Sequence, residues 1–172
     1  GFVIFGDKAA SSADFLSTVI EGGSGIASID LNMPSTLPER FEAGTMSTPA
    51  IAALKKGIDF VKARGTEEIY AHECALGKRL TEMLTSVRNT KVYMPERIGG
   101  TVLFNFADMS SEQLAGELER AGICVRSGLH CAPLAHKTLG TPEYGAVRVS
   151  FSIFNTRNEV DNFYRAYSNI VK

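Results

Sequence analysis

Strand-like and helix-like stretches alternate along the second half of the chain, and this alternation constrains the fold more than any other feature of the sequence. TVLFNF (101–106) has the apolar residues of a strand, and SSEQLAGELERAG (110–122) has the start and stop signals of a capped helix. ICVRS (123–127) and AVRVSFSIF (146–154) are again strand-like, and Thr156 caps a final helical stretch. We expect an α/β or α+β architecture in which helices cover one face of a small, mostly antiparallel sheet.

Two more helices and one more strand are predicted before this region. Ser47 or Thr48 caps the first helix, which takes Pro49 in its first turn and ends near Gly65. Its apolar positions recur at helical spacing: Ile51, Leu54, Ile58 and Val61. The second helix begins at Thr66, and its apolar stripe consists of Ile69, Leu76, Leu80, Met83, Leu84 and Val87. VYM, residues 92–94, is the additional strand.

The first 45 residues have a weaker pattern. GFVIFG, residues 1–6, is predicted to be a strand, and a chain that begins with Gly1 in such a stretch is expected to be a piece of a longer protein. Residues 21–45 are rich in glycine, serine and proline and show no sustained period. A loop of this length within a compact domain is usually functional or disordered.

Composition narrows the class of protein. With 172 residues, 44% of them hydrophobic, and a formal net charge of −1, the chain suits one globular domain and offers no basic face for nucleic acid. No apolar run approaches the roughly 20 residues of a membrane span. Three cysteines without regular spacing argue against a disulfide framework and favour a reducing compartment, so a cytoplasmic protein is expected.

The stretch RSGLHCAPLAHKTLG, residues 126–140, gathers groups that can carry chemistry. Arg126 and the peptide amides of a helix starting near Pro133 can stabilise a thiolate at Cys131, which would make this thiol reactive. The alternative is a small thiol without a role, which we favour for Cys74 and Cys124. The neighbours of Cys131 shift the interpretation toward function.

A metal site is the weaker interpretation of the same stretch. His130, Cys131 and His136 would supply three ligands, but structural zinc takes four, usually in paired spacing, and only His72 and the two other cysteines remain. We therefore predict no metal. His72 is expected to be a solvated side chain on the exposed side of its helix.

Two further signals point to anions. Arg148 lies within AVRVSFSIF, where burial of a guanidinium is costly unless it binds an anion. A small acid bound through two parallel hydrogen bonds would explain an arginine at this position. An arginine on an edge strand that points to water would explain it equally well. EGGSG and FEAGT contain glycines that let backbone amides approach a phosphate. Neither is a P-loop, because the Lys-Ser/Thr ending is missing.

Taken in order, four segments resemble the C-terminal part of a class V aminotransferase-fold enzyme: GFVIFG, EGGSG, LPERFEAGTMSTPAIAALKKGIDFV and RSGLHCAPLAHKTLGTPEYGAVRVSFSIFNT. The chain is most similar to pyridoxal-phosphate-dependent cysteine desulfurases and selenocysteine lyases, over essentially its whole length. RFEAGT and RSGLHCA are the specific motifs. The chain departs from the commonest form of the second motif at Leu129, where many members carry a second histidine.

The resemblance implies the C-terminal domain of a fold-type I pyridoxal-phosphate-dependent transferase. Residues 1–45 would be the end of the large cofactor domain together with an interdomain and dimer loop, and residues 46–172 the small domain. The Schiff-base lysine would lie upstream, so that Lys8, Lys55 and Lys56 do not have that role. The isolated chain is therefore expected to be inactive.

The resemblance also assigns roles within the predicted substrate pocket. Cys131 would take the sulfur of a substrate cysteine as a persulfide and leave alanine. Arg148 would bind the substrate carboxylate, and Arg126 and His130 would line the same pocket.

Other roles implied by the resemblance concern partners. Gly23 and Thr45 would contact the phosphate of the cofactor in the other subunit of a homodimer, and a sulfur-acceptor protein is a further possible partner. Two other functions remain open: an aminotransferase-like enzyme in which Cys131 is not catalytic, and a stand-alone thiol redox or binding domain. The choice between cysteine, selenocysteine and another amino acid as natural substrate is also open.

Overall fold

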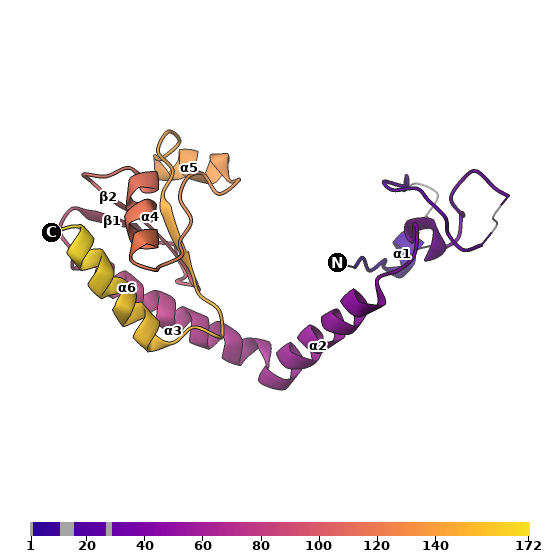
Figure 1. Cartoon of the computed structure of the whole chain (residues 1–172), viewed down its shortest axis with the longest axis horizontal. Coiled ribbons are helices and arrows are strands. Elements are labelled where there is room, and N and C mark those ends of the chain that lie inside the picture. The colour runs from indigo at the N-terminus through magenta and orange to yellow at the C-terminus, as the bar shows by residue number, and fades with distance from the viewer. Residues whose placement is uncertain (1, 11–15, 27–28) are drawn as a thin grey trace. The chain divides into compact units, whose positions relative to one another are not determined.

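The computed structural model describes residues 2–10, 16–26 and 29–172, which form two compact units, Gly1–Ala63 and Arg64–Lys172 (Figure 1). Gly1 of the predicted opening strand and residues 27–28 of the predicted long loop lie outside the described residues. The predicted domain boundary after residue 45 refers to a complete enzyme and stays a prediction.

The N-terminal unit is mostly irregular. Its elements are α1 (Asp7–Ala10), the 3₁₀ helix η2 (Glu39–Phe41) and α2 (Thr48–Arg64). The prediction of a strand at residues 1–6 is wrong for the described residues 2–6, because Phe2, Val3 and Ile4 are exposed and no neighbouring strand pairs with them in the described part of the chain. The backbone groups of these exposed residues can bond to water, so nothing holds the segment as a strand. The predicted first helix is confirmed as α2.

The C-terminal unit contains all strands found in the described residues. Its elements are α3 (Thr66–Thr85), β1 (Thr90–Tyr93), β2 (Thr101–Phe106), α4 (Ser111–Arg120), α5 (Pro133–Leu139), β3 (Val147–Ser150) and α6 (Arg157–Ile170). The strands form one antiparallel sheet in the order β1-β2-β3. The predicted α/β class and small antiparallel sheet are confirmed.

The two faces of this sheet differ because side chains alternate along each strand. Phe104 of β2 lies opposite Val147 of β3, and both side chains are buried on the face covered by helices. Figure 1 shows α3, α4 and α6 packed around the sheet. The buried apolar cluster on this side consists of Leu76, Leu80, Leu84, Val102, Phe104, Phe106, Leu114, Leu118, Val147, Val149, Val160, Phe163 and Tyr167. Arg148 therefore belongs to the opposite face.

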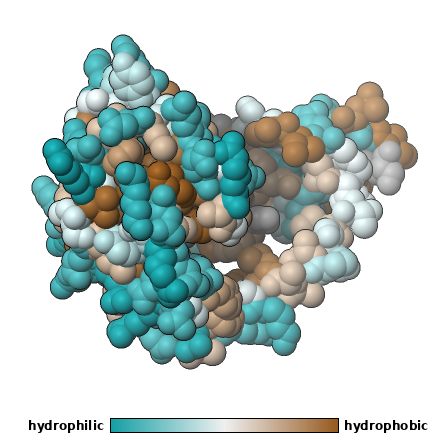
Figure 2. All heavy atoms as spheres, turned by 60° about the vertical axis from the view of Figure 1, so that its left-hand side comes forward, coloured by the Kyte–Doolittle hydropathy of each residue, from teal (hydrophilic) through white to brown (hydrophobic). Residues whose placement is uncertain are grey.

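The outer surface of the C-terminal unit matches the balanced composition. Figure 2 shows hydrophilic side chains over most of the visible face of this unit, interrupted by a smaller apolar area. None of the helices in the described residues is long and apolar enough to cross a membrane.

The strand predicted at residues 123–127 is replaced by a single bridge at Arg126. The backbone of Ile123, the first residue of the predicted strand, bonds to the end of α4 instead. The Ile123 N–H donates to the Leu118 carbonyl at 2.9 Å, and the Gly122 N–H donates to the Glu119 carbonyl at 2.8 Å. These two bonds, with a positive φ at Gly122, form the Schellman motif that ends α4. The backbone of Ile123 is therefore committed to the helix end and cannot start a strand ladder.

The long strand predicted at residues 146–154 is also shorter than expected, since β3 ends at Ser150. After it, the Ser152 N–H donates to Asn155 Oδ1 at 2.9 Å and the Asn155 N–H donates to the Ser152 carbonyl at 3.0 Å. This turn leads into α6. The prediction of a solvated His72 is wrong as well: its Nε2 lies 2.8 Å from the Asn155 carbonyl, and the side chain is half-buried between α3 and this turn.

Both predicted helix caps in the C-terminal half are confirmed. The side chains of Ser110 and Thr156 each accept a hydrogen bond from the backbone N–H three residues later. The side chains of Gln113 and Glu159 in turn accept a hydrogen bond from the backbone N–H of the cap residue. These reciprocal bonds satisfy donors that the first turn of a helix leaves unpaired.

Replacing Thr156 with alanine should therefore lower the free energy of unfolding by about 1 kcal/mol, since the hydroxyl that caps α6 is lost. Thr156→Ser, which keeps the hydroxyl, is the matched control and should remain close to the parent chain. Urea denaturation followed by circular dichroism measures both. Equal stability of the alanine and serine variants would contradict the cap.

Candidate active site

Arg126 and Arg148 are joined by two backbone hydrogen bonds at the free edge of the sheet. The Arg126 N–H donates to the Arg148 carbonyl at 3.1 Å, and the Arg148 N–H donates to the Arg126 carbonyl at 2.7 Å. Residues that exchange both bonds in an antiparallel pair lie directly opposite each other, with side chains on the same face. The two guanidinium groups therefore stand on the face of the sheet that the helices do not cover.

This pair of like charges has no carboxylate partner among the residues that the structure describes. Within the part of the chain that the structure describes, neither arginine forms an ion pair, and the Arg148 Nε is buried without a hydrogen-bond partner. Adjacent like charges are destabilising, and a buried donor without a partner costs about 1–3 kcal/mol. An anion with two acceptor oxygens would satisfy both conditions, and an amino-acid carboxylate is such an anion.

The loop that carries Cys131 leaves directly from this bridge. His130 and Cys131 have φ values of 53° and 58°, so two consecutive non-glycine residues adopt the left-handed conformation. Such residues cost of order 1–3 kcal/mol each and persist where the surroundings hold them. They place the Cys131 side chain at an exposed position just before α5, as predicted.

A close crossing of two glycines holds the loop against the chain that enters β3. The Ala146 N–H donates to the Gly128 carbonyl at 3.2 Å, and a Cβ at Gly145 would overlap the Gly128 backbone. Gly145 also has a φ of 58°. Only a residue without a side chain fits this position, so Gly145 determines how the Cys131 loop lies on the sheet edge.

His130 is bonded at both ring nitrogens. Its Nε2 lies 3.1 Å from the Arg126 carbonyl, and its Nδ1 lies 3.2 Å from Nε2 of His136. Burial lowers the pKa of His130 below its ordinary value, and the charges of Arg148, His136 and Arg126 lower it further, while the bond to the Arg126 backbone acts in the opposite direction. The imidazole of His130 therefore lies beside the two arginines in its neutral form.

The predicted phosphate-binding residues lie in the N-terminal unit. The Gly44 N–H donates to the Gly23 carbonyl at 2.8 Å, which brings Gly23 next to the segment that carries Thr45. Both residues are exposed, and a Cβ built at Gly23 would meet no atom within 4 Å. An exposed hydroxyl beside an open glycine turn is a donor set that fits a phosphate group.

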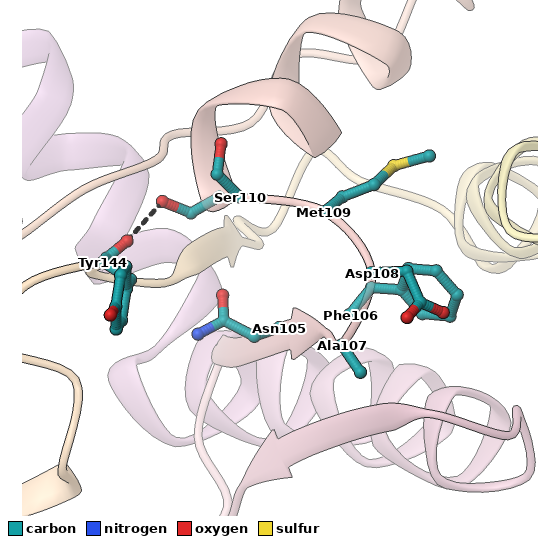
Figure 3. Close-up of a pocket in the computed structure, with 8 residues that line it drawn as sticks. Asn105, Phe106, Ala107, Asp108, Met109, Ser110 and Tyr144 are labelled. Atoms are coloured by element: carbon teal, nitrogen blue, oxygen red, sulfur yellow. Dashed lines mark hydrogen bonds between the residues drawn. The ribbon is translucent and has the colours of Figure 1, made fainter.

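A surface hollow of about 500 Å³ lies at the end of β2 and the start of α4. Figure 3 shows Asn105 and Tyr144 on one side of it and Asp108 and Met109 on the other. Asn105 donates to the Gly145 carbonyl at 2.9 Å, and its Oδ1 is buried without a partner. Cys131 and the two arginines do not line this hollow, so it is not the predicted site.

Sequence reasoning missed part of the site. His136 entered only as a possible zinc ligand, and Thr141 and Asn105 were not considered. Among the described residues no group of three or more histidine, cysteine or acidic side chains is arranged to hold a metal ion. The buried His136 instead faces His130 and Thr141.

Comparison with known proteins assigns the chain to a family. The family profile described as "Aminotransferase class-V" matches residues 3–163. The chain belongs to the aminotransferase class-V family. A cysteine desulfurase from Pectobacterium carotovorum is 34% identical over 143 residues, which are 81% of this chain and 35% of the relative. A probable cysteine desulfurase from Halobacterium salinarum is 36% identical over 126 residues, covering 72% of this chain and 30% of the relative.

Solved structures agree with the family assignment. The apo cysteine desulfurase from Thermococcus onnurineus superimposes with a TM-score of 0.71 and 36% identity, over 78% of this chain and 34% of that one. A cysteine desulfurase from Escherichia coli has a TM-score of 0.80 over 95% of this chain and 41% of that one; at 20% identity this likeness shows the fold alone. The chain thus spans about a third of the length of the curated relatives it matches.

The glycine crossing gives a direct test of the site geometry. Gly145→Ala should lower the free energy of unfolding by at least about 1–3 kcal/mol, because the added methyl meets the Gly128 backbone and the left-handed conformation disfavours alanine. Gly116→Ala, in the interior of α4 where a Cβ meets nothing, should be neutral or stabilise by about 0.5–1 kcal/mol. Thermal and urea unfolding compare the two variants, and a harmless Gly145→Ala would show that the crossing is not tight.

Proposed function

We propose that the chain is the C-terminal part of a pyridoxal-phosphate-dependent cysteine desulfurase-like enzyme. The enzyme removes sulfur from cysteine, or selenium from selenocysteine, and leaves alanine. The observation that carries the proposal is the pair of guanidinium groups held by the backbone bridge from which the Cys131 loop departs, with no carboxylate partner in the described part of the chain. The cysteine desulfurase relatives support the same reaction class.

The two arginines bind the substrate carboxylate. A guanidinium offers parallel N–H donors that match the two carboxylate oxygens, and Arg148 has a buried donor at Nε that still lacks an acceptor. Arg126 is more exposed and lies on the same face, where it adds positive charge beside Arg148. The substrate is thereby fixed with its side chain free to reach a neighbouring group.

Cys131 is the acceptor of the sulfur. Its thiolate attacks the sulfur of the bound substrate, so that an S–S bond forms while the substrate Cβ–S bond breaks. The electron pair of the broken bond stays with the three-carbon product, which takes up a proton to become alanine. The exposed position of Cys131 also lets a second thiol remove the transferred sulfur afterwards, which suits a sulfur-acceptor protein as partner.

Pyridoxal phosphate, when bound, supplies the electron sink for this chemistry. Gly23 and Thr45 would hold the phosphate of the cofactor in the other subunit of a homodimer, and the fit of their exposed donors to a phosphate supports this role. The Schiff-base lysine is proposed to lie outside this chain. The three cysteines are free, which suits the reducing cytoplasm as the location.

The isolated chain should consequently bind no pyridoxal phosphate at a defined lysine. Incubation with the cofactor, reduction with borohydride and peptide mass spectrometry should give only scattered, substoichiometric labelling of surface lysines. Stoichiometric labelling of one lysine would contradict the proposal that the Schiff-base lysine lies elsewhere.

In the full-length enzyme, Cys131→Ala should abolish sulfide and persulfide formation from cysteine and leave cofactor absorbance unchanged, because the thiolate is needed only to take the sulfur. Cys124→Ala is the matched control, since Cys124 is also exposed but lies outside the loop, and it should retain activity. Full activity of Cys131→Ala would favour the aminotransferase-like alternative.

Arg148→Lys should weaken substrate binding, because an ammonium group cannot make the two-pronged carboxylate contact. The loss in kcat/KM should correspond to on the order of 2–5 kcal/mol, the usual cost of disrupting a buried charge pair. Steady-state kinetics with cysteine measures the change. An unchanged KM and kcat/KM would mean that Arg148 does not hold the carboxylate.

A further inference from the structure

A series of three hydrogen bonds, called the hydrogen-bond chain below, runs from Thr141, just after the C-terminal end of α5, to the arginine bridge. Thr141 Oγ1 lies 2.9 Å from Nδ1 of His136, and Nε2 of His136 lies 3.2 Å from Nδ1 of His130. Nε2 of His130 lies 3.1 Å from the Arg126 carbonyl, which also accepts the Arg148 N–H. The chain therefore ends on an atom of the arginine bridge itself.

The direction of every bond in this chain follows from its last acceptor. A carbonyl can only accept, so Nε2 of His130 carries the proton and donates. In the neutral ring Nδ1 is then an acceptor, which makes Nε2 of His136 the donor toward it. Nδ1 of His136 is left as an acceptor and receives the single Thr141 hydroxyl proton at 2.9 Å, in preference to the more distant His136 carbonyl at 3.5 Å, which already accepts the Thr141 N–H. All four groups are satisfied in one arrangement, with both imidazoles as Nε2–H tautomers.

Burial prevents water from replacing the partners in this arrangement. His136 is 1% exposed and Thr141 is 5% exposed, so neither can exchange its partner for water. A second proton on His130 would put an N–H against the N–H of His136 and break the bond. The groups that face His130 are Arg126, Arg148 and His136, and the positive charges of the two arginines disfavour such protonation.

We propose that His136 and Thr141 are positioning residues of the candidate active site: their hydrogen-bond chain fixes the tautomer of His130 and anchors the strained Cys131 loop to the Arg126 carbonyl. The left-handed conformations of His130 and Cys131 need such support, because two consecutive non-glycine residues with positive φ are costly. The chain thus couples the location of the thiol to that of the arginine pair. Its meaning for catalysis rests on the proposed function, whereas the hydrogen-bond chain stands on geometry alone.

Acidification should break the hydrogen bond between His130 and His136. Because the pKa of His130 is lowered in the folded protein, the unfolded chain binds more protons near the ordinary value of about 6.5. The contribution of the neutral ring to stability is fully present above that value and is lost progressively as the pH falls through the folded pKa. The loop should therefore loosen on acidification rather than in base.

Histidine nitrogen NMR tests the proposal on the chain itself, which contains only three histidines. Long-range proton–nitrogen correlation spectra should show His130 and His136 each as a single Nε2–H tautomer at neutral pH, with the titration midpoint of His130 below its ordinary value. Thr141→Val, which keeps the side-chain shape but removes the hydroxyl donor, should mix the tautomers of His136 and raise the midpoint of His130. Thr141→Ser should restore the parent spectrum.

An Nδ1–H tautomer at His130 would contradict the proposed series of hydrogen bonds. Identical spectra for Thr141→Val and the parent protein would contradict it as well. In the full-length enzyme Thr141→Val should lower kcat for cysteine with KM unchanged, since the arginine pair still binds the carboxylate. An unchanged kcat beside altered tautomers would overturn the positioning role. If the parent enzyme released no alanine from cysteine while the tautomers were as expected, the proposed function would fail and the hydrogen-bond chain would stand.

Discussion

The backbone bridge between Arg126 and Arg148 is the interaction on which the candidate site depends. Two hydrogen bonds, of 3.1 Å and 2.7 Å, hold two positive side chains on one face at a sheet edge. Like charges in this arrangement are unfavourable unless an anion lies between them, so the protein keeps an electrostatic cost that a carboxylate ligand would relieve. The opposite face of the same sheet carries the apolar core, which fixes the edge in place.

The Cys131 loop is built on this bridge by constraints that act from three sides. The close contact between Gly128 and Gly145 holds the loop against the segment that enters β3. His130 bonds to the Arg126 carbonyl through Nε2 and to His136 through Nδ1. The helix α5 follows immediately and sets the path of the chain beyond the thiol. A strained pair of residues can persist here because its surroundings determine it, and this is a common property of functional loops.

Much of the fold could be predicted from local patterns. The caps Ser110 and Thr156 marked two helices correctly because a capping box is a short-range signal. The strand predicted at residues 123–127 is absent because a Schellman motif uses the backbone of Ile123. The strand predicted at residues 146–154 is present but ends at Ser150, because the Asn155 side chain forms a turn with Ser152. His72, His136 and Thr141 were misread or missed since their partners, Asn155 and His130 among them, are determined by tertiary packing.

The most direct test of the account is to locate the sulfur after one turnover. The full-length enzyme is mixed with one equivalent of cysteine, free thiols are alkylated, and the peptides that contain Cys74, Cys124 and Cys131 are weighed by mass spectrometry. The account predicts one added sulfur atom on the Cys131 peptide, none on the other two, and one alanine released for each sulfur. Alanine formation without sulfur on Cys131, or sulfur spread evenly over the three cysteines, would contradict it.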